Sequence, residues 1–314
     1  MAGRTTRTSK SLTQPLFFFI DYFTLIYQIR QNLLMNKNDT SSISFTAHYT
    51  GYVWYKNRLS NDAFATKQGY AYYQMLRPIE VLAKKFIGSD IKTTLLQRHQ
   101  LLDRELISLI QQHPDLQILE LACGLSPRGW RINKKYPYIH YIEADLAGMA
   151  QQKHALLNKI DSLNHRHQVS ICNILTEHSP DSVESLLKRE FDPTKPVLVI
   201  TEGLVNYFTL AHIGTFWIRL AKTLKAFSAG YYLTDVYPKV TQHRFYHWIE
   251  FANKTLKVSS KSSFSMHFEH QQEASEFFKV CGFPQVTIFN PDEELSDQPK
   301  TKGGSLVWVI KAQV

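Results

Sequence analysis

Acidic and amide side chains recur in this sequence at the ends of short apolar runs. They are Glu120, Glu143, Asp145, Asn173, Glu202 and Asp235. Short apolar runs are typical of buried parallel strands, and ligands of an open α/β sheet bind at the carboxyl ends of its strands. A row of carboxylate and amide oxygens at that edge suits a ligand that is rich in hydroxyl and amine donors.

The turn after the first apolar run distinguishes two kinds of nucleotide ligand. It reads ACGLSPRG from Ala122 to Gly129 and lacks the GxGxxG pattern that places a pyrophosphate on a helix N-terminus. Gly124 alone allows close approach of a nucleoside without phosphate. Asp145 follows 21 residues later, where an acid accepts ribose hydroxyls. These features predict S-adenosylmethionine rather than a nicotinamide dinucleotide.

The elements that must position these side chains alternate between strands and helices. Residues 63–110 have helical periodicity, and a helix with one apolar face begins after Thr209. A helix from Gln271 precedes two strands with no helix between them, so we expect this closing pair to be antiparallel. The predicted strands are residues 116–122, 139–144, 168–174, 196–201, 230–234, 285–289 and 306–311. The alternation predicts an α/β fold, with a parallel sheet covered by helices on both faces.

Larger blocks of sequence add to this prediction. They are Ser44–Trp54, Leu119–Arg128, Tyr141–Leu146 and Thr201–Phe208. The last three resemble the signature segments of the leucine carboxyl methyltransferase superfamily, which includes polyketide O-methyltransferases, and the first resembles the opening segment of a bacterial branch of that group. The resemblance covers roughly residues 43–312. It implies a class I, Rossmann-like methyltransferase fold, a seven-stranded sheet whose last strand is antiparallel, and S-adenosylmethionine as the cofactor.

The resemblance also implies roles for individual residues. Gly124 would lie under the cofactor, Asp145 would hold its ribose, and Asn173 stands where the family usually has an acid beside the adenine. Glu202 would face the amino-acid end of the cofactor, and we expect Arg77 to bind its carboxylate. Ala122 replaces the family's usual glycine. The predicted cofactor-binding residues are Arg77, Glu120, Ala122, Gly124, Glu143, Asp145, Asn173 and Glu202.

Methyl transfer from a sulfonium depends on the alignment of acceptor, methyl group and sulfur, and it needs no covalent residue. A carboxylate acceptor is ionised near neutral pH, whereas a hydroxyl acceptor benefits from a nearby base. The candidate catalytic residues are His48, Tyr49, Tyr207 and His247. His243 and His247 are four residues apart but have no third ligand nearby in the sequence, so no metal site is predicted.

Composition limits the class of protein. The chain has 314 residues, of which 44% are apolar and 13% aromatic, which is enough for a large core and excludes a disordered chain. Three cysteines without a CxxC pair argue against a disulfide framework and a structural zinc site, and they favour a cytoplasmic location. The net charge of +9 is partly carried by the first 38 residues, which hold five basic residues and one acidic residue. The mildly basic remainder does not predict a nucleic-acid partner.

The sequence divides into three regions. We interpret residues 1–38 as an extension that is either disordered or absent from the native protein, residues 39–112 as a helical cap on the substrate side, and residues 113–314 as the S-adenosylmethionine-binding core. The apolar run Leu16–Ile20 ends at Asp21 and is too short to cross a bilayer, so we expect no membrane span.

These observations predict an S-adenosylmethionine-dependent O-methyltransferase that acts on a small-molecule hydroxyl or carboxylate, as polyketide O-methyltransferases do. One alternative is a protein carboxyl methyltransferase that modifies the terminus of a partner chain. Another is a non-catalytic cofactor-binding protein. Nucleic-acid methylation is disfavoured because the sequence has no Asn/Asp-Pro-Pro-aromatic tetrapeptide. The expected partner is therefore a small-molecule acceptor, and the oligomeric state stays open.

Overall fold

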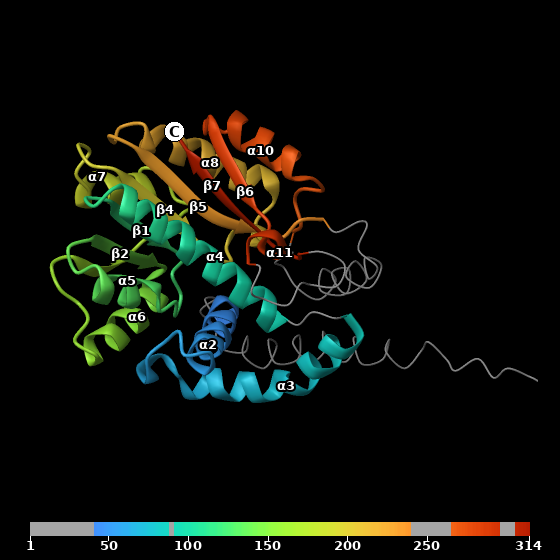
Figure 1. The fold of residues 1–314 in the computed structure, drawn as a ribbon. Coiled ribbons are helices and arrows are strands. Elements are labelled where there is room, and N and C mark those ends of the chain that lie inside the picture. The colour runs from blue at the N-terminus through green and yellow to red at the C-terminus, as the bar shows by residue number, and fades with distance from the viewer. Residues whose placement is uncertain (1–40, 88–90, 240–264, 296–304) are drawn as a thin grey trace, which may run out of the picture.

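A seven-stranded sheet forms the centre of the molecule (Figure 1). The computed structural model describes residues 41–87, 91–239, 265–295 and 305–314. The strand order is β3-β2-β1-β4-β5-β7-β6, in which β7 is antiparallel to both of its neighbours and the other paired strands are parallel. The strands are β1 (Gln117–Leu121), β2 (His140–Asp145), β3 (His167–Ile171), β4 (Val197–Thr201), β5 (Gly230–Val236), β6 (Gln285–Phe289) and β7 (Trp308–Gln313). This sheet confirms the expected class I fold with its antiparallel last strand.

Side-chain alternation along the central strands creates two apolar faces. On β4, Val197 and Val199 pack in one core with the helices of residues 183–190, 210–224 and 271–280, whereas Leu198 and Ile200 pack in another core with the helices of residues 91–112 and 128–135. All residues of β1, β4 and β5 are buried, as expected for strands that are covered on both sides. The helices of this part are α5 (Arg128–Lys135), α6 (Ala147–Lys159), α7 (Val183–Glu190), α8 (Leu210–Leu224), α10 (Gln271–Val280) and α11 (Pro291–Glu294), with a 3-10 turn η2 (Val205–Tyr207).

The N-terminal elements are α2 (Ser41–Lys56), the 3-10 turn η1 (Asp62–Phe64), α3 (Lys67–Ile87) and α4 (Ile91–Gln112). Of these, α2 and α3 lie beyond one end of the sheet, whereas α4 crosses one of its faces (Figure 1). Helix α2 lies against α3 on one side and against the loop after β1 on the other, where Gly51 is close enough that a Cβ would lie 3.1 Å from Leu125 Cβ. Helix α4 differs from the other two because its leucines form part of the core beneath the sheet. The helical region of residues 39–112 is thus continuous with the core through α4.

Residues 1–38, which the sequence analysis interprets as an extension, lie outside the described residues. Within the described ranges, no helix combines the length and the apolar character needed to cross a bilayer.

Candidate active site

The loop after β1 brings Gly124 against Asp145, the acid at the end of β2. The Gly124 N–H donates to Asp145 Oδ2 at 2.8 Å, and the Leu146 N–H donates to Oδ1 at 2.7 Å. Burial raises the pKa of Asp145 above its ordinary value, and these two hydrogen bonds oppose the rise. Each carboxylate oxygen keeps a further lone pair. Asp145 can therefore hold the loop and still accept a hydrogen bond from a hydroxyl group of a ligand.

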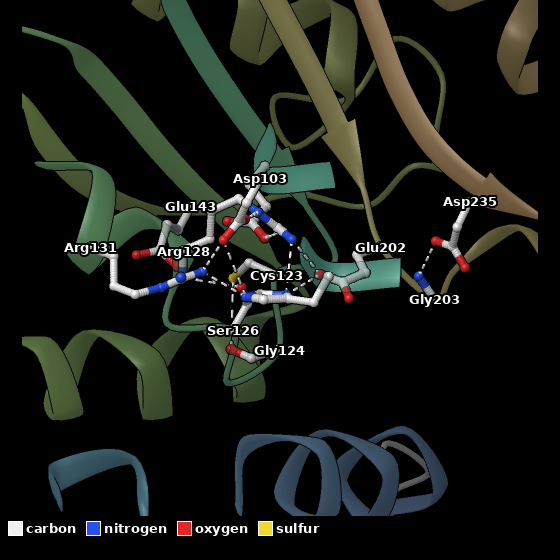
Figure 2. A network of polar contacts seen from close by, with 12 residues as sticks. Asp103, Cys123, Gly124, Ser126, Arg128, Arg131, Glu143, Glu202, Gly203 and Asp235 are labelled. Carbon is white, nitrogen blue, oxygen red and sulfur yellow. Dashed lines mark hydrogen bonds and ion pairs between the residues drawn. The ribbon is translucent and has the colours of Figure 1, made fainter. Parts of the chain in front are cut away.

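A second cluster lies at the ends of β4 and β5, where Arg98 from α4 meets two acids. Arg98 Nε donates to Glu202 Oε1 at 3.0 Å, and Nη1 donates to Asp235 Oδ2 at 3.3 Å and to the Tyr237 hydroxyl at 3.1 Å. The Gly203 N–H donates to the other oxygen of Asp235 at 2.6 Å, as Figure 2 shows. Gly203 has a φ of +68°, and a Cβ at this position would lie 3.1 Å from Arg98 Nη1. The glycine thus allows the guanidinium to lie directly against the backbone.

Arg128 joins the helical region to the strand ends. Its side chain is fully buried, and its three nitrogens donate to carboxylates from three elements (Figure 2). Nε donates to Asp103 of α4 at 2.7 Å, Nη1 to Glu120 of β1 at 2.6 Å, and Nη2 to Glu202 after β4 at 2.6 Å. A guanidinium can bind three carboxylates at once in this way because its donors form a rigid planar fork. Arg128 therefore fixes α4 relative to the sheet edge.

The charge of Glu202 is stabilised from several directions. Burial opposes its ionisation, but His99, Arg128 and Arg98 together hold the pKa of this carboxyl well below its ordinary range. The Nδ1 atom of His99 lies 2.9 Å from Glu202 Oε2. Glu202 is therefore a carboxylate at neutral pH, fixed between two arginines at the end of β4.

Two acids that are predicted to bind the cofactor are buried in the structure. Glu120 is buried and accepts from Arg128, and Glu143 is fully buried between Lys153 and His167. Both side chains point into the protein. Glu120 is paired there with Arg128, and Glu143 with Lys153. A contact between these two residues and the cofactor stays a prediction, and in the structure both carboxylates are occupied by internal partners.

The arginine predicted to bind the cofactor's carboxylate is not the buried arginine that the structure places at the strand ends. Arg77 is exposed on α3, whereas the arginine at the strand ends is Arg98. The available signal was the helical pattern of α4, in which Arg98 shares a face with Leu95 and Leu102. A charged residue on an otherwise apolar helix face indicates a buried partner, and here the partners are carboxylates.

The other predicted cofactor residues lie on loops at the same edge of the sheet. Ala122 has a φ of +51°, the left-handed region, at the position where the family usually has glycine. Asn173 follows β3, and its Oδ1 accepts from the Leu175 N–H at 3.0 Å. The amide of Asn173 is thus used to shape its own loop.

Two of the candidate bases come from α2. His48 is buried with Nδ1 2.9 Å from Thr66 Oγ1, and burial lowers its pKa from the ordinary value. Tyr49 is buried in the apolar cluster between α2, α3 and α4. His247 lies outside the described residues. The two described residues therefore take part in the packing of the helical region.

Tyr207 differs from those two because it is 42% exposed. Its hydroxyl lies 3.5 Å from Thr46 Oγ1 of α2, so this side chain spans from η2 toward the helical region. Tyr237, which the sequence analysis did not single out, follows β5 and contacts Arg98 through its hydroxyl. No motif marks it, since only the packing of α4 brings it to the site.

The sequence of this chain matches the model of a known protein family. Residues 58–216, just over half of the chain, match the leucine carboxyl methyltransferase family. The chain belongs to this family. It is an S-adenosylmethionine-dependent methyltransferase, in agreement with the resemblance in its sequence blocks. No curated protein matches its sequence.

Two solved structures have a similar fold to this methyltransferase. One is a protein from Thermobifida fusca YX assigned as a methyltransferase, with 13% identity and a TM-score of 0.57, covering 85% of this chain and 93% of that chain. The other is a DUF574 family protein from Streptomyces avermitilis MA-4680, with 14% identity and a TM-score of 0.57, covering 85% of this chain and 96% of that chain. At these identities the likeness supports the fold.

The residues at the strand ends fit the cofactor of this methyltransferase. Asp145 has a carboxylate that could accept hydrogen bonds from hydroxyl groups, and it lies next to a glycine without a side chain. Arg98 presents a cation, and its Nη2 makes no hydrogen bond within the described residues. The site thus has a hydrogen-bond acceptor for hydroxyl groups and a donor for a carboxylate, and S-adenosylmethionine carries these groups at its two ends.

Proposed function

We propose that this methyltransferase transfers a methyl group to an oxygen of a small molecule, either a hydroxyl or a carboxylate. The observation that supports the cofactor placement best is the Gly124–Asp145 hydrogen bond of 2.8 Å beside the buried Arg98–Glu202 pair. An oxygen acceptor is supported by the matching family, whose description names a carboxyl group.

In this proposal the chain's own residues bind the two ends of the cofactor. Asp145 accepts hydrogen bonds from the ribose, and Gly124 lets the nucleoside approach the backbone. Arg98 Nη2 donates to the carboxylate of the amino-acid end, while Glu202 orients Arg98 and offsets its charge. Asp235 holds the same guanidinium from its other side. The bound methionine portion is thereby fixed in direction, which is the main requirement for in-line transfer.

The bound cofactor supplies an activated methyl group on a sulfonium. A carboxylate acceptor is already ionised near neutral pH and asks for no proton transfer. A hydroxyl acceptor needs a base, and among the described candidates Tyr207 is the one that reaches the surface. A carboxylate acceptor therefore needs no general base among the described residues, whereas a hydroxyl acceptor does.

A binding experiment tests the cofactor site. Isothermal calorimetry with S-adenosylhomocysteine should show that Asp145→Ala weakens binding at least tenfold, about 1.4 kcal/mol, because the ribose hydroxyls lose their acceptor. The exposed Asp115→Ala, which removes the same charge before β1, serves as the matched control and should bind like the wild type. Equal affinity for Asp145→Ala and the wild type would overturn the placement.

A turnover experiment tests the acceptor. The protein is incubated with labelled S-adenosylmethionine and a panel of carboxylic acids, phenols and amines, and formation of S-adenosylhomocysteine is followed. A methyl ester releases methanol in mild base, whereas a methyl ether does not, so this treatment separates carboxylate from hydroxyl acceptors. Turnover restricted to amines contradicts an oxygen acceptor.

The family description also favours a second candidate, a carboxyl methyltransferase that acts on a partner protein. Peptides with a free C-terminal carboxylate, including a terminal leucine, belong in the same panel beside their amidated forms. Methylation of the free peptides alone, with no turnover of small acids, would replace the small-molecule proposal by this one.

A further inference from the structure

Lys153 of α6 has no exposed surface, which is unusual for a lysine. Its ammonium donates to the Ser126 carbonyl at 2.5 Å and to the Gly124 carbonyl at 3.4 Å, and it forms an ion pair with Glu143. An ammonium has three donors and no acceptor, and two of its donors are used by the carbonyls while its charge faces the carboxylate of Glu143. Two of its three partners are thus backbone carbonyls of the loop that the proposed cofactor site uses.

The charge of Lys153 is balanced inside the protein. Glu143 is fully buried, and its second oxygen lies 2.8 Å from His167 Nε2. Burial disfavours the ionised forms, but the attraction to Glu143 raises the pKa of Lys153 to about 12, and the attraction to Lys153 lowers the pKa of Glu143. Both groups are therefore ionised at neutral pH.

The surroundings of the Lys153–Glu143 pair are closed from two other elements. The ring of Phe64 in η1 is fully buried, and its centroid lies 5.7 Å from Lys153 Nζ. On α5, a Cβ at Gly129 would lie 2.3 Å from Glu143 Oε1, so only glycine leaves room for the carboxylate. The Lys153–Glu143 pair is thus enclosed between the loop after β1, α5 and α6.

The loop held by this pair has an unfavourable backbone conformation. Ala122 and Gly124 have φ values of +51° and +49°. A non-glycine residue in the left-handed region persists only where its surroundings determine it. The N–H of Gly124 is fixed by Asp145, and the Gly124 and Ser126 carbonyls are fixed by Lys153. Asp145 and Glu143 lie two residues apart on β2, so their side chains leave the same face of the strand: Asp145 binds the loop directly, and Glu143 binds Lys153.

We propose that Lys153, held by Glu143, is a positioning residue that fixes the carbonyls of Gly124 and Ser126 and thereby keeps the loop after β1 in its cofactor-binding conformation. The inference rests on the proposed placement of the cofactor at Gly124 and Asp145. Lys153 acts through the backbone and touches no reacting atom. Loss of its ammonium frees the loop to relax, so the bound state must order it again at the expense of affinity.

The test compares S-adenosylhomocysteine binding by calorimetry in the full chain with amide hydrogen exchange at residues 124–126. We expect Lys153→Met to weaken binding at least tenfold and to speed exchange in this loop. Lys153→Arg, which keeps the charge and the donors, should recover most of the affinity. Lys159→Met removes an exposed lysine from the same helix and should leave both readouts unchanged.

If Lys153→Met does not fold, the double variant Lys153→Met with Glu143→Gln keeps both side chains close to their original size without burying an unpaired charge, and the same loss of affinity is expected. Wild-type affinity in folded Lys153→Met, or in the double variant, overturns the inference, even if the unfolding midpoint of that variant falls. Asp145→Ala separates the two proposals. If Asp145→Ala weakens binding and the Lys153 variants do not, only the role of Lys153 fails, whereas if Asp145→Ala binds normally, the cofactor placement itself fails.

Discussion

The indole of Trp54 stacks on the imidazole of His99, with ring centroids 4.3 Å apart and an interplanar angle of 24°. Trp54 belongs to α2 and His99 to α4, and both are buried. The same imidazole lies 2.9 Å from Glu202 through Nδ1. One pair of rings therefore links the outer helix of the N-terminal region to the charged cluster at the end of β4.

We predict that Trp54→Ala destabilises the fold by about 3 kcal/mol, because it leaves a cavity beside His99 and removes the ring contact. Urea unfolding followed by circular dichroism measures this change. Lys56→Ala, at an exposed position of the same helix, should change the free energy of unfolding by less than about 0.5 kcal/mol. A cost below about 1 kcal/mol for Trp54→Ala would show that α2 is not held through this stack.

A second prediction concerns acid stability. The pKa of Glu202 lies well below its ordinary value of 4.5, since His99, Arg128 and Arg98 outweigh the effect of burial. When the pKa of a carboxyl group is lower in the folded state, the unfolded state takes up the proton at a higher pH than the folded state does. Its contribution to stability is therefore complete above pH 4.5 and is lost as the pH falls through the lower, folded value.

The free energy of unfolding should accordingly fall as the pH decreases below that ordinary value. In Glu202→Gln this part of the pH dependence disappears, and at pH 7 the variant is less stable by about 3 kcal/mol because Arg98 and Arg128 keep their charges without this partner. Urea titrations at several pH values measure both effects. Asp115→Asn, at an exposed position, is the control. A Glu202→Gln profile parallel to the wild type contradicts the prediction.

The meeting of Gly124 and Asp145 was predictable from the sequence for a simple geometric reason. Strands β1 and β2 are parallel and pair with Leu121 opposite Ala144, so the residues that follow them emerge at the same edge. An apolar run, a glycine and an acid suffice to place these two residues together. The closing antiparallel pair was equally accessible from the two adjacent apolar runs. The sequence missed the four-residue helix α11 (Pro291–Glu294), which lies between these two strands where no helix was expected.

The internal ion pairs were not predictable in the same way. Whether Glu120 and Glu143 face a ligand or the interior depends on where Arg128 and Lys153 lie, and those cations come from helices that follow in the chain. Arg98 raises the same difficulty, since its partners Glu202 and Asp235 lie more than a hundred residues away in sequence. Sequence periodicity indicates which residues share a helix face, but not which distant charge meets them.

The backbone at Ala122 gives a third prediction. Its φ of +51° costs roughly 1–2 kcal/mol for a residue with a Cβ, whereas glycine adopts this region freely. Glycine also adds entropy to the unfolded chain, so Ala122→Gly should stabilise the protein by only about 0.5 kcal/mol. Ala155→Gly, at an exposed position within α6, should instead destabilise it by about 1 kcal/mol. If both substitutions destabilise equally, the left-handed conformation at Ala122 carries no strain.

Gly203 is the position where substitution should affect the charged cluster most directly. A Cβ there would lie 3.1 Å from Arg98 Nη1, and the φ of +68° is unfavourable for alanine. Gly203→Ala must therefore displace the guanidinium from Asp235 and Glu202 or change the backbone that donates to Asp235. We expect a loss of about 2 kcal/mol in the free energy of unfolding, from backbone strain and weakened buried ion pairs together.

The same displacement moves Arg98 Nη2, the donor proposed for the cofactor's carboxylate, so Gly203→Ala should also weaken S-adenosylhomocysteine binding in calorimetry. Gly148→Ala is the matched control, because Gly148 is exposed within α6 and alanine there should stabilise the helix by about 0.5 kcal/mol or more without changing affinity. A Gly203→Ala protein that is less stable but binds with wild-type affinity would separate the two effects. It would show that the position of Arg98 matters for folding but not for the ligand, and the carboxylate role of Arg98 would then be wrong.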